Sequence, residues 1–363
     1  MENTSSALRT IVQPFYMKAS IVLMGISLFF FILDLLENIL IPISFGLMLA
    51  ILLNPVVNKL ISWKFPKLVA IGISLLLSLA FVFALISFIY GQVETIVENS
   101  EGFEERGTDI LEGVQAWITN TLGFDKEKQL EALNDLANQS KDYIGSFLDS
   151  AFTILSSTLL VFIYIFMFLL YKPLFVNFFF EVFGESQQVK VQSVLMSSKV
   201  AIQGYVVGLM LEMLIMAVLN SIAYLIIGID YAILLGIICA ILNLVPYIGG
   251  IIGVLLPIAM YLLTGGTDLT TPIVIASVYT GIQLVDNYFI VPKVVSSKVS
   301  INAFAAIIII FLGGALWGIA GMFLSILFIA ILKIIFENVE SLQPWAKILG
   351  DDLKGAEQLK NSR

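Results

Sequence analysis

One uncharged apolar run, from Tyr231 to Leu263, sets the main constraint on how this chain can fold. As a single α-helix the run would be roughly 50 Å long, whereas the hydrocarbon core of a bilayer is about 30 Å thick. The helix must therefore tilt strongly or break. Pro246 lacks a backbone donor and its ring clashes with the preceding turn, so we predict a break between Asn243 and Pro246.

The break has two interpretations, and the sequence leaves both open. Backbone groups freed in lipid need partners in the protein or in a water-filled cavity, and many transporters build a solute site from such discontinuous helices. That interpretation makes Asn243, Pro246, Gly249 and Gly250 candidate substrate-binding residues. Alternatively the break is only a kink, with Gly249 and Gly253 as packing points that let another helix approach closely.

The amino-acid composition indicates that the other apolar runs also lie in a membrane. Of the 363 residues, 59% are hydrophobic and only 13% are charged, whereas soluble proteins are about 25% charged. We therefore predict an all-α, polytopic bundle of transmembrane helices. The chain has no histidine, which excludes a Ser-His-Asp triad and a His-ligated zinc site, and its single cysteine, Cys239, excludes an intrachain disulfide. It has no P-loop motif. We expect a protein that is not an enzyme and has no cofactor, no metal and no nucleic-acid partner.

The polar segments divide the chain into five parts. We predict an N-terminal cytoplasmic segment with three spans (1–90), then an acidic extracytoplasmic helical region (91–150). Next come a fourth and a fifth span (151–228), joined by a helix over 172–203 that lies on the cytoplasmic membrane surface. A transport region (229–338) and a cytoplasmic tail (339–363) complete the chain.

Charge predicts the topology. Residues 91–150 hold 13 acidic and four basic side chains, whereas lysines concentrate in the other connecting segments. Because basic residues favour the cytoplasmic side, both termini would be cytoplasmic and 91–150 would lie outside. The runs 231–263 and 303–332 must then each enter and leave on one side. We predict two re-entrant hairpins, the second broken at Gly313–Gly318, with tips that meet near the middle of the membrane.

Polar side chains inside predicted spans are candidate functional residues, because they are costly in hydrocarbon unless they are paired. Gln283, Asp286 and Asn287 share one helix face and could bind a hydroxylated solute or a cation. Alternatively they are an interfacial cap, with Asp286 paired to a lysine such as Lys293. Glu212 could carry a proton, with Asn220 on roughly the same face, or could be a neutral structural residue.

Three sequence blocks make the chain resemble the autoinducer-2 exporter family of bacterial membrane proteins. They are PISFGLMLAILLNP (Pro42–Pro55), NLVPYIGGIIG (Asn243–Gly253), and QLVDNYFIVPKVV with LGGALWGIAGMFLSI (Gln283–Val295 and Leu312–Ile326). The resemblance covers nearly the whole chain. It marks as structural motif positions Pro42, Gly46, Pro55, Gly253, Pro292, Gly313, Gly314 and Gly318. The chain departs from the family pattern at Ser296, Asn302-Ala303 and Leu327, where relatives often have Gly, His-Pro and Pro.

The resemblance implies a homo-oligomer, with pentamers in relatives, in the bacterial inner membrane. It also implies two activities, which are export of autoinducer-2 and sodium(lithium)/proton exchange. Our leading hypothesis is a secondary transporter that exports a small polar solute such as autoinducer-2 by alternating access. One alternative is a sodium(lithium)/proton antiporter that uses Glu212 and Asp286 for ion or proton coupling. The other is a non-transporting membrane scaffold.

Overall fold

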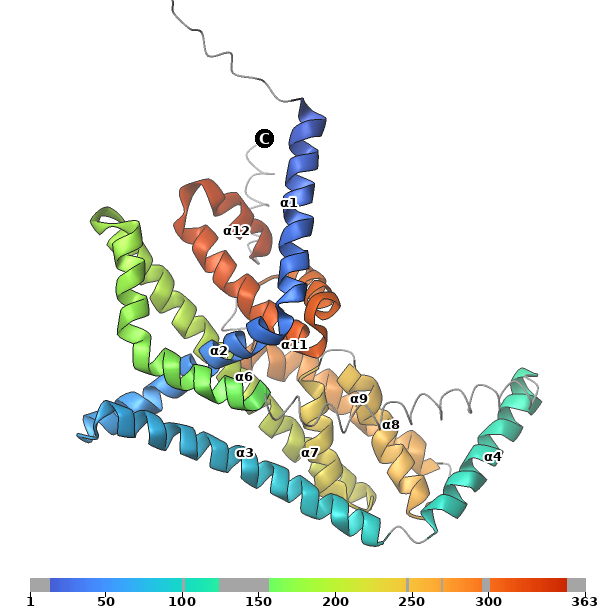
Figure 1. The fold of residues 1–363 in the computed structure, drawn as a ribbon. Coiled ribbons are helices and arrows are strands. Elements are labelled where there is room, and N and C mark those ends of the chain that lie inside the picture. The colour runs from blue at the N-terminus through green and yellow to red at the C-terminus, as the bar shows by residue number, and fades with distance from the viewer. Residues whose placement is uncertain are drawn as a thin grey trace, which may run out of the picture.

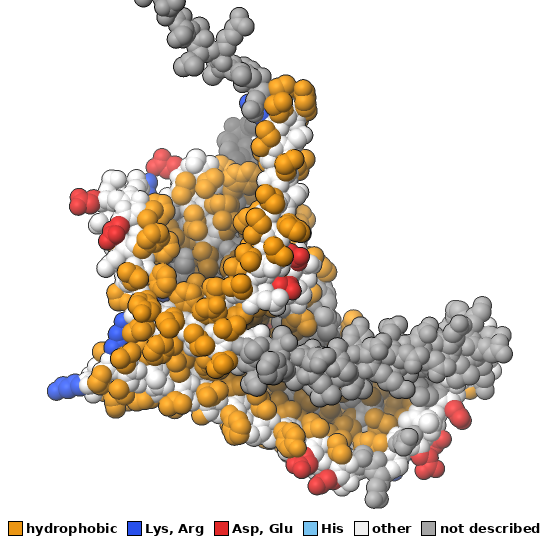
Figure 2. All heavy atoms as spheres, in the orientation of Figure 1, with side chains coloured by type: hydrophobic (Ala, Val, Ile, Leu, Met, Phe, Trp, Pro, Cys, Tyr) orange, Lys and Arg blue, Asp and Glu red, His pale blue; other side chains and the backbone are white. Residues whose placement is uncertain are grey.

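The computed structural model describes residues 14–99, 102–123, 157–245, 248–268, 270–295 and 301–350. Within these ranges all regular structure is helical and no strand occurs. Seven of the helices are long and apolar enough to cross a membrane. The predicted fold class, a polytopic bundle of membrane helices, is therefore confirmed, and hydrophobic side chains cover most of the visible surface (Figure 2).

The N-terminal half supplies four long apolar helices and the helix α4. These are α1 (Phe15–Leu35), α2 (Glu37–Ser62), α3 (Lys67–Glu98), α4 (Phe103–Leu122) and the helix Ser157–Phe183. α1 has no buried residue, and most of its length stands away from the other helices, with its C-terminal end beside α2 and α11 (Figure 1). Its side chains are therefore free to face lipid or another subunit.

The helix α2 carries both prolines of the first motif block. Pro42 and Pro55 lie inside the helix without ending it. Gly46 faces the helix Ser157–Phe183, where an added Cβ would stand 2.6 Å from Tyr164 Cβ. A glycine at this position therefore permits the close approach of the two helices.

The region 172–203 differs from the sequence prediction of a separate surface helix. Residues 172–183 continue the preceding long helix, and after the short η1 (Glu185–Gln187) the helix α6 (Gln188–Ile227) starts at once. The scattered lysines broke the apolar pattern on which the prediction depended. Backbone hydrogen bonding in a helix tolerates such polar positions near a span end, so two long helices form here.

The predicted break in 231–263 is present. α7 (Ala232–Asn243) ends at Asn243, and α8 (Ile248–Leu263) packs back against it. Pro246, which motivated the prediction, lies outside the described residues. α9 (Thr270–Val285) follows and leads through a π-helical turn, η2 (Asp286–Ile290), into α10 (Val291–Val294). That the α7–α8 hairpin re-enters the bilayer stays a prediction.

The run 303–332 also forms a hairpin. α11 (Ala303–Asn338) is interrupted at Trp317 and Gly318, where Gly318 has φ +56°, a backbone conformation that favours glycine. An added Cβ on Gly313 would meet the Gly321 carbonyl, and one on Gly314 would meet Met322, so both glycines lie where the two arms touch. The short elements η4 (Glu340–Leu342) and α12 (Gln343–Leu349) end the described chain.

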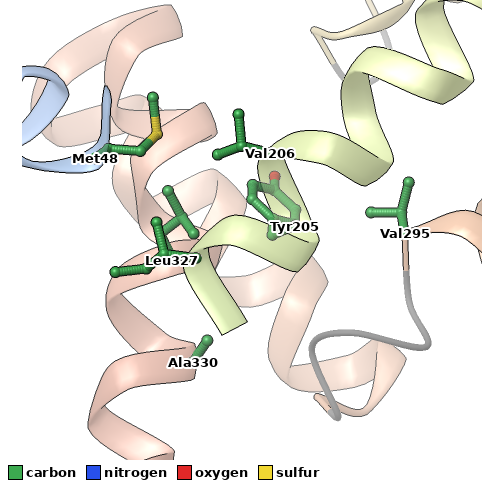
Figure 3. Packing of buried hydrophobic residues seen from close by; sticks show 7 residues of the cluster. Met48, Tyr205, Val206, Val295, Leu327 and Ala330 are labelled. Carbon is green, nitrogen blue, oxygen red and sulfur yellow. The ribbon is translucent and has the colours of Figure 1, made fainter. Parts of the chain in front are cut away.

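The two hairpins share α6 as a neighbour and otherwise pack on different helices. α7 and α8 contact α6 and α9, whereas α11 contacts α6, α2 and α1. One hydrophobic cluster joins α2, α6 and α11 through Met48, Tyr205 and Leu327 (Figure 3). Trp317, at the α11 tip, donates from Nε1 to the Leu33 carbonyl of α1, at 3.1 Å. Among the described residues, no extensive packing joins α11 to α7 or α8. Residues 246 and 247, at the tip of the first hairpin, lie outside these residues, so the meeting of the two tips stays a prediction.

Two sets of side-chain contacts join segments for which the charge pattern predicts the same side of the membrane. Arg106 of α4 donates to the Leu263 carbonyl at the end of α8, at 3.0 Å. Both segments were assigned to the outside. Asn302 donates to the Ile348 and Gly350 carbonyls, on the side assigned to the cytoplasm. The sides of the membrane on which these segments lie stay a prediction.

Candidate functional site

The side-chain amide of Asn243 lies between two carboxyl groups. Its Nδ2 donates to Glu212 Oε1 at 3.1 Å and to Asp286 Oδ2 at 3.0 Å. Glu212 comes from α6 and is buried, and Asp286 begins η2 and is only 1% exposed. A primary amide has two N–H groups, so one nitrogen can serve both carboxyl groups at once. We call Glu212, Asn243 and Asp286 the carboxyl–amide cluster.

A chain of hydrogen bonds extends this cluster along α9. Gln283 Nε2 donates to Asn243 Oδ1 at 2.8 Å and to the Tyr279 hydroxyl at 2.9 Å. Tyr279 in turn donates to the Gly249 carbonyl at 3.1 Å. The connected polar groups therefore run from α6 through the α7 end to the first turn of α8.

The helix break brings these groups together. α7 ends at Asn243, so its last side chain stands at the hairpin tip, where α6 and α9 both pack. An added Cβ on Gly249 would run into the Leu242 carbonyl, and one on Gly253 would run into the Tyr279 ring. The glycines are thus packing points as well, and the two interpretations of this segment do not exclude each other. Gly250 faces open space.

Asp286 has unused hydrogen-bonding capacity. Its Oδ1 is buried and has no hydrogen-bond partner in the described part of the chain. Asn220, two turns further along α6 than Glu212, is fully buried, and neither of its amide atoms has a described partner. Unpaired buried polar atoms are rare and call for a bound water, ion or solute.

The remaining predicted site residues lie apart from the cluster. Asn287 is exposed and lies in the π-helical turn that begins at Asp286, so it is not buried beside the Asp286 carboxyl group as the shared-face prediction required. Asp286 Oδ2 accepts from Asn243, and the alternative pairing of Asp286 with a lysine stays a prediction. The motif residues Pro42, Gly46, Pro55, Pro292, Gly313, Gly314 and Gly318 belong to α2, α10 and α11 and are not part of the cluster.

Sequence reasoning missed Tyr279. This tyrosine is 2% exposed and stands one turn before Gln283 on α9. A buried tyrosine hydroxyl needs a hydrogen-bond partner, so the spacing of four between two polar groups in an apolar helix was a usable signal.

The cluster offers oxygen atoms and few donors. Two carboxyl groups, an amide oxygen and a backbone carbonyl suit a proton, a monovalent cation or a hydroxylated solute. No group of three His, Cys, Asp or Glu side chains suited to a metal ion is found among the described residues. The site can therefore act by reversible binding and needs no covalent step.

A polytopic helical bundle with a polar cluster at a broken helix has the architecture of a membrane transport protein. Comparison of the sequence with known protein families supports the same class. The model of the AI-2E family transporters matches residues 19–341, so the chain belongs to that family and has a role in membrane transport.

Two relatives are similar over most of their length and a third over about a third of it. A putative transport protein of Bacillus subtilis, YueF, is 25% identical over 317 residues, which cover 82% of this chain and 83% of the relative. The AI-2 transport protein TqsA of Escherichia coli is 21% identical over 319 residues, covering 86% and 90%. A putative transport protein of Borreliella burgdorferi is 28% identical over 134 residues, covering 37% and 36%.

Proposed function

We propose that the protein is a secondary transporter that exports a small polar solute and couples the export to a proton or monovalent cation held by the carboxyl–amide cluster. The observation that carries this proposal is the bridging of Glu212 and Asp286 by one amide group. Two negative charges buried side by side in a membrane-spanning bundle are costly. A proton or cation shared between them removes that cost, and its release restores it.

The hairpin gives the site a way to respond to occupancy. Asn243 belongs to α7, whereas its two carboxyl partners belong to α6 and η2. A change of charge between the carboxyl groups alters the hydrogen bonds that hold the hairpin tip against both neighbours. Such a change can bias a rigid-body movement of α7 and α8, as alternating access requires.

The solute site would lie beside the cluster, with Gln283, Asp286 and the backbone of the hairpin tip as binding groups. The unpartnered Oδ1 of Asp286 can accept a hydroxyl, which suits a sugar-like molecule. One relative is named as an AI-2 transport protein, and this name supports autoinducer-2 as the first solute to test. We place the protein in the bacterial inner membrane with both termini cytoplasmic.

A second candidate function is sodium(lithium)/proton exchange without an organic solute. The same bridged carboxyl pair favours it, because oxygen-rich sites at the ends of broken helices suit Na⁺ as well as a proton. In this case the pair would be the entire transport site, and Gln283 and Tyr279 would only position Asn243.

Reconstituted vesicles test both functions. We expect wild-type protein to move protons when Na⁺, Li⁺ or autoinducer-2 is added on one side. Asp286→Asn and Glu212→Gln, which remove one charge each, should abolish the coupled proton flux. Asp230→Asn, at an exposed position in the turn before α7, is the matched control and should keep it. Wild-type flux in the double variant Asp286→Asn/Gln283→Ala would refute a transport role for the cluster.

The added substance distinguishes the two functions. Proton flux driven by Na⁺ or Li⁺ alone favours exchange, and flux that requires autoinducer-2 favours export. Flux with neither would direct the search to another solute, and a comparison of the solutes outside cells with and without the protein would identify it.

A further inference from the structure

A cavity of about 360 Å³ lies between α2, the start of α3 and the helix Ser157–Phe183. None of its described lining residues belongs to the carboxyl–amide cluster. Lys67 and Lys172 line the cavity, and none of the described lining residues is acidic. Lys199 of α6 and Lys67 both act electrostatically on Lys172, so three like charges converge on this region. Figure 2 shows lysine and arginine side chains along this edge, where α2 meets α3. The cavity is therefore suited to an anion.

The hydrogen-bonding groups point to the same ligand. Asn54 lines the cavity and is only 5% exposed. Its Oδ1 accepts from Lys172 Nζ at 3.1 Å, whereas its Nδ2 is buried and has no described partner. Lys67 Nζ donates one bond to the Leu170 carbonyl, at 2.7 Å, and has further hydrogens available. Asn54 Nδ2 and Lys67 Nζ are therefore the hydrogen-bond donors that remain available in the cavity. Such donors bind an acceptor group such as a phosphate.

The start of α3 adds to this preference. α3 begins at Lys67 after Pro66, and no side chain caps its first turn. The free N–H groups at a helix start carry partial positive charge and bind phosphate groups well. The helix start, the lysine pair and the unpartnered amide are separate features that converge on one cavity.

The residues that line the cavity favour a phospholipid over a soluble phosphate as the ligand. Val57, Ile61 and Val176 lie in the same cavity wall as the lysines, so the wall offers apolar surface next to cationic groups. The cavity lies beside the α2–α3 connection. Trp63, 62% exposed, lies under the Lys59 ammonium at the same end of α2. Exposed aromatic and basic residues mark the membrane interface.

We propose that Lys67, Lys172 and the Asn54 amide bind the phosphate group of an anionic phospholipid in the leaflet that faces the cytoplasm. Basic pockets between membrane helices on that side suit anionic head groups. The bound lipid would neutralise the lysine cluster and join α2, α3 and the helix Ser157–Phe183. The site is separate from the carboxyl–amide cluster, so its test does not depend on the transported solute.

Native mass spectrometry of the purified full chain tests the proposal with phosphatidylglycerol and phosphatidylcholine as probes. We expect wild-type protein to retain phosphatidylglycerol in preference to phosphatidylcholine. The double variant Lys67→Gln/Lys172→Gln keeps a donor at each position and removes only the charge. It should bind phosphatidylglycerol roughly 10-fold more weakly or worse. Lys64→Gln, in the same α2–α3 connection but outside the cavity lining, is the matched control and should bind like wild type.

Two results would overturn the proposal. One is equal retention of phosphatidylglycerol by the double variant and the Lys64→Gln control. The other is displacement of the lipid by inorganic phosphate at equal concentration, which would identify a site for the free anion. Should the double variant not fold, a photoreactive phosphatidylglycerol on wild-type protein decides the matter. Labelling in 54–67 and 169–177 supports the site, and labelling only elsewhere refutes it.

Discussion

Replacing Asn243 by alanine should measure how strongly the hairpin tip is held. The substitution removes three side-chain hydrogen bonds, at 3.1, 3.0 and 2.8 Å, to Glu212, Asp286 and Gln283. Hydrogen bonds between side chains in membrane proteins contribute about 0.6 kcal/mol each on average. The three bonds together would contribute about 2 kcal/mol, and buried oxygens left unpaired raise the cost further. We expect the free energy of unfolding to fall by about 2–4 kcal/mol.

A double-mutant cycle separates the bridging bond from general damage. Asn243→Ala and Asp286→Ala, alone and together, are unfolded chemically in mild detergent, and tryptophan fluorescence follows the transition. If the amide binds Asp286, the two effects should deviate from additivity by about 0.6–1.7 kcal/mol. Asn302 is a matched control, since its side chain also makes three hydrogen bonds, at the start of α11.

The control cycle pairs Asn302→Ala with Asp286→Ala and should be additive within about 0.5 kcal/mol. Equal additivity in both cycles would refute a direct bond between Asn243 and Asp286. A loss below about 0.5 kcal/mol for Asn243→Ala alone would refute the reasoning that the cluster holds the hairpin tip.

Three further predictions follow from the fold. Single cysteines at Thr121 and Gln358, in a Cys239→Ser background, should be labelled from opposite sides of the membrane; labelling from one side would refute the topology. Gly46→Ala should destabilise the protein by about 1–3 kcal/mol in thermal unfolding, because its Cβ would enter the neighbouring helix, whereas Gly25→Ala, with open space around it, should not. Native mass spectrometry in mild detergent should show a homo-oligomer, since α1 leaves its apolar side chains exposed, and monomers alone would contradict this.

Hydrophobic length and backbone breakers, which are local properties, determined most of the fold. The apolar runs predicted the membrane-spanning helices, because a helix in lipid must satisfy its own backbone and present apolar side chains around it. The excess length of 231–263 and 303–332 predicted their breaks, and the structure has them at Asn243 and at Trp317–Gly318. Each of these features depends on residues within one helix length of each other.

The tertiary structure decided which residues form the carboxyl–amide cluster and which helices pack together. Glu212, Asn243 and Asp286 lie on three helices, and no periodicity along the chain relates them. Asn287 is exposed although it follows the buried Asp286, which accepts from Asn243 of another helix. The lysine cavity likewise combines α2, α3 and the helix Ser157–Phe183. Sequence reasoning could find the costly polar groups, but their partners depend on which helices pack together.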